Sequence, residues 1–123
     1  MLLKFDFGSN VPIYMQLRNQ VVIAIAEGVL APGEQLPTIR ALAEESGINM
    51  MTVSKAYNLL KQEGYITTDR RKGATVAYKS GTPQVKEETI NALRLSLSEL
   101  RLAGMNKQQI TELLDTLCEE AGL

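Results

Sequence analysis

The chain has 123 residues, of which 45% are hydrophobic, and it carries 13 Lys and Arg against 14 Asp and Glu. This length fits one domain with a small appendage, and the composition is that of a globular protein rather than a disordered one. Because it has neither a run of 18 apolar residues nor an apolar N-terminal stretch, we expect no membrane span, no signal peptide and a cytoplasmic protein.

The sequence is poor in residues that carry chemistry. It has no histidine and a single cysteine, Cys118. This removes the commonest general base and excludes an internal disulfide or a Cys-rich zinc site. No Gly-rich phosphate loop and no cluster of carboxylates is present either. We therefore expect no enzyme, no cofactor and no bound metal.

Charge is distributed unevenly along the chain. Residues 36–80 carry seven bases and four acids, a net charge of +3, whereas residues 1–35 and 81–123 have net charges of −1 and −3. A basic middle between acidic flanks indicates a polyanionic partner that touches only the middle, although the excess is small.

The first half predicts an arm and three helices. Residues 2–7 alternate in polarity, as in a short strand or an extended arm. A helix is expected over about residues 12–28, with Pro12 at its first position. A second runs from Pro37 and Thr38 to residue 46, and a third covers about 50–63 after a cap at Asn49. The last two, joined by a Gly-containing turn, have the helix-turn-helix pattern.

A basic hairpin follows these helices. Strands are predicted at 65–68 and 74–78, around the turn 69–73, and residues 80–83 form a linker. Arg70, Arg71 and Lys72 repel one another in this turn, and phosphates would neutralise them. The alternative is a solubilising turn. Such a hairpin beside a helix-turn-helix makes a winged helix.

The third helix has two different faces. At 100° per residue, residues 53, 56, 57 and 60 face the core, whereas Met51, Ser54, Lys55, Asn58 and Gln62 lie opposite. A polar face that includes an exposed methionine suits the major groove, where apolar atoms meet thymine methyls. The alternative is an ordinary solvated face.

Two helices are predicted beyond the linker, at about 84–103 and 107–121. The first has one apolar stripe that includes Leu93 and Leu97, and Leu95 and Leu102 lie nearly opposite. One stripe can pack on the last helix through residues 113, 114 and 117, and the other needs the winged helix or a second subunit. We expect a dimer interface here, formed by Ile90, Leu93, Leu95, Leu97, Leu102, Leu113 and Leu117.

The segments at 36–43 (LPTIRALA), 47–49 (GIN), 52–57 (TVSKAY), 63–66 (EGYI) and 72–73 (KG) together resemble the winged-helix domain of the GntR family of bacterial transcription factors. The resemblance extends over about residues 10–78 and includes 12–17 (PIYMQL) and 28–33 (GVLAPG). The short tail is similar to that of the YtrA-type subfamily, which lacks a large effector domain. The resemblance implies a tail that helps to build a homodimer.

The resemblance also implies DNA contacts at the start of the second helix, at the tip of the third and in the wing. With Lys55 added from the outer face of the third helix, the candidate DNA-binding residues are Arg40, Asn49, Met50, Met51, Thr52, Ser54, Lys55, Arg70, Arg71, Lys72 and Gly73. The methionine pair departs from the polar or basic residues frequent in the family, and thioethers cannot read guanine by paired hydrogen bonds. An alternative for Arg40 is an ion pair with Glu44.

We therefore expect a mainly α fold with a small β-hairpin, made of a winged helix-turn-helix domain (1–80) and a two-helix dimerisation tail (81–123). The expected function is sequence-specific transcriptional regulation, as a homodimeric repressor on a palindromic operator in double-stranded DNA. The main alternative is a winged-helix protein-interaction module, and an enzyme fragment is a weaker one. No small-molecule effector is evident, although two tails could enclose one between subunits.

Overall fold

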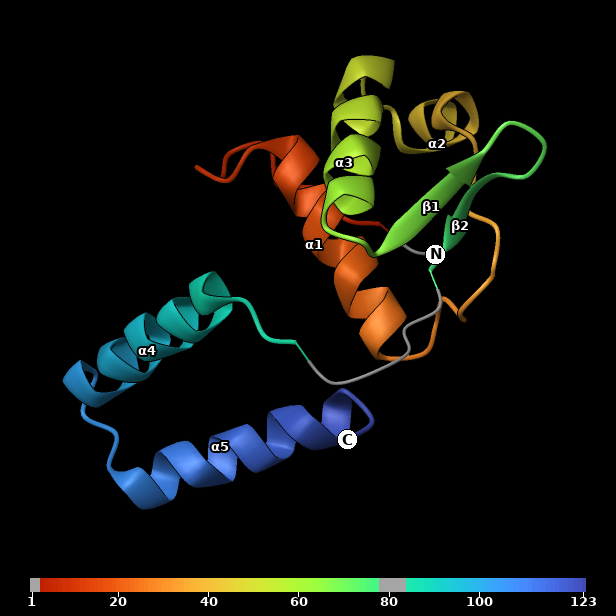
Figure 1. The fold of residues 1–123 in the computed structure, drawn as a ribbon. Helices are drawn as coiled ribbons and strands as arrows, with labels where there is room; N and C mark the ends of the chain where they lie inside the picture. The colour runs from red at the N-terminus through yellow and green to blue at the C-terminus, as the bar shows by residue number, and fades with distance from the viewer. Residues whose placement is uncertain (1–2, 78–83) are drawn as a thin grey trace. The chain divides into compact units, whose positions relative to one another are not determined.

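The computed structural model describes residues 3–77 and 84–123, in which five helices and one two-stranded sheet are found. The chain divides into two compact units, residues 1–79 and 80–123. The expected mainly α fold with a small β-hairpin is confirmed (Figure 1). The predicted linker at 80–83 and the end of the second predicted strand at residue 78 lie outside the described residues.

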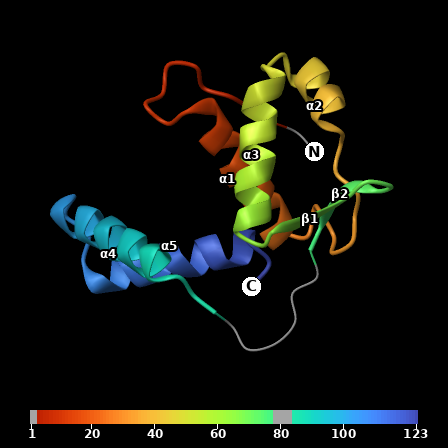
Figure 2. The same cartoon turned by 45° about the horizontal axis from the view of Figure 1, so that its top comes forward.

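Three helices form the body of the first unit. They are α1 (Ile13–Ala26), α2 (Ile39–Ser46) and α3 (Met50–Gln62), and α3 packs against both of the others (Figures 1 and 2). The helix α1 begins one residue later than predicted, because Pro12 has an extended ψ of 148° and occupies the cap position.

Side-chain caps and one glycine define the helix-turn-helix. The Thr38 hydroxyl accepts a hydrogen bond from the amide of Ala41 at 3.0 Å, so Thr38 caps α2 rather than opening it. Gly47 ends α2 with a φ of +72°, a left-handed backbone conformation that glycine adopts at a lower energetic cost than other residues. The Asn49 side chain accepts from the amide of Met51 at 2.7 Å, which confirms the predicted cap of α3.

The wing is an antiparallel hairpin of β1 (Ile66–Asp69) and β2 (Gly73–Val76), paired from Ile66↔Val76 to Asp69↔Gly73. A third extended segment, around Gln35, pairs with β2, and the sequence did not predict it. The amide of Leu36 donates to the Ala74 carbonyl at 2.8 Å, and the amide of Val76 donates to the Glu34 carbonyl at 2.9 Å. The chain before α2 therefore completes the base of the wing.

A single core holds these elements together. Its most deeply buried side chains come from α1, α3 and both strands, and they are Leu17, Val21, Val53, Leu60, Ile66 and Val76. The residues before α1 form the extended arm, one of the two predicted alternatives. The amides of Lys4 and Asp6 donate to the side chains of Gln20 and Gln16, both at 2.9 Å.

The second unit is an open helical hairpin of α4 (Glu87–Leu102) and α5 (Lys107–Glu120), whose arms diverge from the turn between them (Figure 1). Asn106 and Gln109 form a reciprocal capping box at the start of α5. Ile110, near the turn, is the one buried residue that the structure describes in this unit.

The expected packing of an α4 stripe on α5 was wrong. Leu93 and Leu97 on α4 and Leu114 and Leu117 on α5 are all exposed, and Leu113 is half-buried. The helices separate after the turn, so the apolar residues farther along each helix do not meet. Both stripes of α4 are therefore largely uncovered within this unit.

Candidate nucleic-acid interface

The helix α3 presents two faces of opposite character, as its periodicity predicted. Val53, Ala56, Tyr57 and Leu60 are buried, and Met51, Lys55, Asn58 and Gln62 are exposed. Ser54 and Thr52 are half-buried at the edges of the outer face. Because the inner face is held in the core, the outer face is available to a partner along the whole helix.

The tip of α3 carries a pair of exposed methionines. Met51 is 80% exposed and Met50 47% exposed. Asn49 beside them uses its side-chain oxygen for the helix cap, so its amide NH₂ is the group left to donate to a ligand. The first turn of α3 can therefore offer one polar donor and two flexible apolar side chains to a base edge.

Arg40 lies exposed in the first turn of α2, the helix that precedes α3. The ion pair with Glu44 that the spacing allows is not formed among the described residues. The guanidinium of Arg40 is thus not neutralised within the described chain and can bind an anion.

The wing tip projects away from the helices in both views (Figures 1 and 2). Asp69 accepts from the amide of Arg71 at 2.7 Å, and Gly73 has a φ of +70°, so the turn is tight. The side chains of Arg70, Arg71 and Lys72 are exposed and form no ion pair with any described residue. Three unneutralised cations therefore lie together on one exposed loop.

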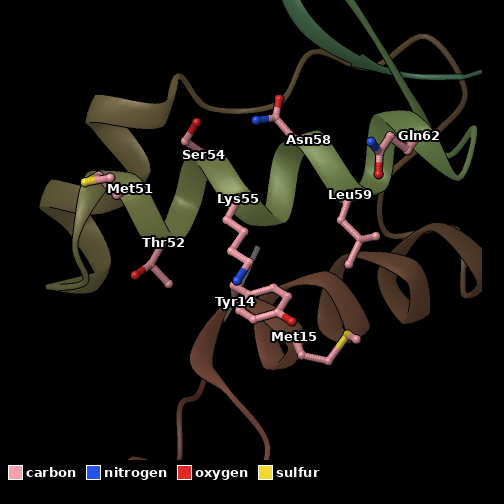
Figure 3. Close-up of a pocket in the computed structure, with 9 residues that line it drawn as sticks. All are labelled: Tyr14, Met15, Met51, Thr52, Ser54, Lys55, Asn58, Leu59 and Gln62. Carbon is pink, nitrogen blue, oxygen red and sulfur yellow. The ribbon is translucent and has the colours of Figure 1, made fainter.

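Lys55 differs from its neighbours on α3. Its ammonium lies 4.1 Å from the centre of the Tyr14 ring, within an open hollow between α1 and α3. Figure 3 shows Lys55 directed toward α1, whereas Ser54 and Asn58 point the other way. The sequence pattern placed Lys55 with the base-reading residues and did not identify Tyr14. No spacing in the sequence links these two residues.

Two long-range contacts support the site from behind. The guanidinium of Arg18 on α1 forms a two-bonded ion pair with Glu63, at 2.7 and 2.9 Å, and this hydrogen bonding raises the pKa of Arg18. The hydroxyl of Tyr57 donates to the Pro37 carbonyl at 2.7 Å, and burial raises the pKa of Tyr57 to about 12. These contacts hold α3 to α1 and to the segment before α2.

Within 3–77 and 84–123, no three His, Cys, Asp or Glu side chains gather in a way that could hold a metal ion. No helix in those ranges has the length and apolar character needed to cross a bilayer.

Known proteins share this architecture. Residues 13–76 match the family described as bacterial regulatory proteins, gntR family. The HTH-type transcriptional repressor YtrA of Bacillus subtilis (strain 168) is 32% identical over 115 residues, which cover 90% of this chain and 88% of the relative.

Solved structures agree with this match. The crystal structure of a transcriptional antiterminator from Listeria monocytogenes EGD-e has a TM-score of 0.87 and 29% identity, covering 98% of this chain and 92% of that one. The AraR DNA-binding domain in complex with operator ORE1 has a TM-score of 0.53 and 27% identity, covering 62% of this chain and 95% of that one. The matched family consists of DNA-binding regulators rather than enzymes. This chain is accordingly a YtrA-type member of the gntR family of bacterial regulatory proteins, with a DNA-binding winged helix.

Proposed function

We propose that the protein is a transcriptional repressor that binds a palindromic operator as a homodimer in the bacterial cytoplasm. The observation that carries this proposal is the outer face of α3, which is exposed along its length beside cations that no described carboxylate neutralises. The relative YtrA is named a repressor, and the AraR domain is bound to an operator. Repression would follow from occupation of a promoter.

The proposed contacts divide by chemistry. Base edges would be read by Asn49, Met50, Met51, Thr52 and Ser54, which lie in the first turns of α3. Phosphates would be bound by the cations of α2 and the wing, together with the backbone of Gly73. These cations are Arg40, Arg70, Arg71 and Lys72. A duplex bound this way would bury the methionine pair against thymine methyls, which explains why two apolar side chains are exposed there.

The proposed dimer rests on the tail. Both apolar stripes of α4 are uncovered, and Leu95 and Leu102 are 61% and 86% exposed. A helix that is apolar on two sides is normally buried on both, so a second copy is the partner we propose for Ile90, Leu93, Leu95, Leu97, Leu102, Leu113 and Leu117. Two copies would present two recognition helices to an operator with matching symmetry.

Selection of bound sites from random duplex DNA, at two salt concentrations, tests the proposal. We expect enrichment of an inverted repeat whose preference over random DNA persists at the higher salt, because base contacts carry the preference. Enrichment of a single unrepeated half-site would contradict the homodimer. A pool without any enriched sequence would favour a protein-interaction module.

A further inference from the structure

We propose that Tyr14 of α1 is a positioning residue for DNA binding, which holds the Lys55 ammonium at the α1–α3 junction as a contact for one backbone phosphate. This inference rests on the proposed function. It moves Lys55 from the base-reading face to the backbone-binding part of the interface, and it makes α1 contribute to that interface.

Tyr14 gives the Lys55 side chain a preferred position. The ammonium of Lys55 lies 4.1 Å from the Tyr14 ring centre, well inside the distance of about 6 Å at which a cation and a ring attract each other (Figure 3). Tyr14 lies in the first turn of α1 and is half-buried against the core, so the ring itself is held in place. A flexible lysine side chain is thereby given a preferred position before any ligand binds.

The positive charge of Lys55 is available to a ligand. No described carboxylate pairs with it, so its positive charge is not neutralised within the described chain. A ring occupies one side of an ammonium, and the remaining N–H donors stay available to an acceptor such as a phosphate oxygen. Because the ring already restricts the side chain, less conformational entropy is lost when the phosphate binds.

Lys55 leaves α3 on a flank of the helix, where the phosphates that border a major groove would lie. An α-helix about 10–12 Å across fills a major groove about 12 Å wide, so side chains on its flanks meet the phosphate walls rather than the base edges. Lys55 leaves α3 on the flank toward α1, whereas Ser54 points to the other side (Figure 3). Its reach is therefore toward a phosphate that borders the groove.

The test measures binding of the full chain to a fluorescent duplex over a salt series. Lys55→Met should lower the magnitude of the salt slope by about one unit, so its affinity loss between 50 and 200 mM salt should be about fourfold smaller than that of the wild type. Tyr14→Leu should reduce the slope in the same direction. In the Lys55→Met background, Tyr14→Leu should have no further effect. The matched control Tyr14→Phe keeps the ring and should retain the wild-type slope.

The outcomes separate this inference from the function on which it rests. A wild-type chain that does not bind the duplex would contradict the proposed function itself. If the wild type binds and Tyr14→Leu keeps its slope, the Tyr14–Lys55 contact only joins two helices and the inference is wrong. An equal loss from Tyr14→Leu with and without Lys55 would also overturn it. Thermal unfolding of each variant identifies any that does not fold. If Tyr14→Leu does not fold, the salt slope of Lys55→Met still decides the phosphate contact, and a wild-type slope in that variant would overturn the inference.

Discussion

Tyr57 links α3 to the segment before α2, because its hydroxyl donates to the Pro37 carbonyl at 2.7 Å from a side chain that is 5% exposed. Removal of this hydroxyl leaves the carbonyl without its donor. We expect Tyr57→Phe to lower the free energy of unfolding by about 1 kcal/mol at pH 7. Urea unfolding of both proteins measures the difference.

The same residue predicts a dependence on alkaline pH. Burial raises the pKa of Tyr57 to about 12 from the ordinary tyrosine value of 10.0. A raised pKa in the folded state contributes stability that is complete below the unfolded pKa and is lost as pH rises toward the folded pKa. The wild type should therefore lose up to about 2–3 kcal/mol between pH 10 and 12 beyond what Tyr57→Phe loses. Parallel pH profiles for the two proteins would refute this assignment.

At the scale of elements, the wing is the part that we expect to bind DNA without regard to sequence. Replacing Arg70, Arg71 and Lys72 with Ala should weaken binding to all duplexes alike, and the salt slope should fall by about one unit for each phosphate that is no longer bound. Equilibrium binding at several salt concentrations measures the slope. The matched control replaces Arg94, Arg101 and Lys107 in the tail, which changes the net charge equally. Equal effects of the two triple variants would mean that the wing does not touch DNA.

The first turns of α3 are the element that we expect to read sequence. Met51→Ala, Thr52→Ala and Ser54→Ala should each reduce the preference for the selected site more than they reduce binding to random DNA. A good base contact contributes about 1–3 kcal/mol of discrimination. Competition between specific and random duplexes measures the preference, with Gln62→Ala at the far end of α3 as the control. Unchanged preference in all three variants would place the reading surface elsewhere.

At the scale of the whole molecule, we expect the tail and the winged helix to have separate tasks, dimerisation and DNA binding. The winged helix has its own core, whereas α4 has no buried residue. Leu95→Asp with Leu102→Asp should therefore give a folded monomer that binds the operator much more weakly. Each leucine buried in a dimer would contribute about 1.5–3 kcal/mol, and two charges in that position would abolish this contribution.

Sedimentation gives the oligomeric state of this double variant. Ala92→Asp with Ser96→Asp adds the same charge on the flank of α4 between its two apolar stripes and should leave the dimer intact. A dimeric leucine variant would place the interface elsewhere. An unfolded one would mean that the stripe packs within its own chain.

The local structure of this protein could be predicted from residues that lie close together in the chain. Caps and glycines such as Asn49 and Gly47 define helix ends through bonds between residues a few positions apart, so they can be read directly. The two faces of α3 follow from its 3.6-residue period, and the family resemblance follows from several local motifs together.

Which distant groups meet depends on the packing of the helices and strands, and the sequence did not predict it. Arg18 and Glu63 are 45 residues apart, and Lys55 reaches Tyr14 because α1 and α3 pack at one particular angle and distance. The segment around Gln35 pairs with β2 although its sequence has no strand pattern. The periodicity of α4 and α5 predicts two helices with apolar stripes, but it does not predict how far the two helices diverge after the turn between them. Such contacts depend on the sum of the packing across the core, which no local pattern encodes.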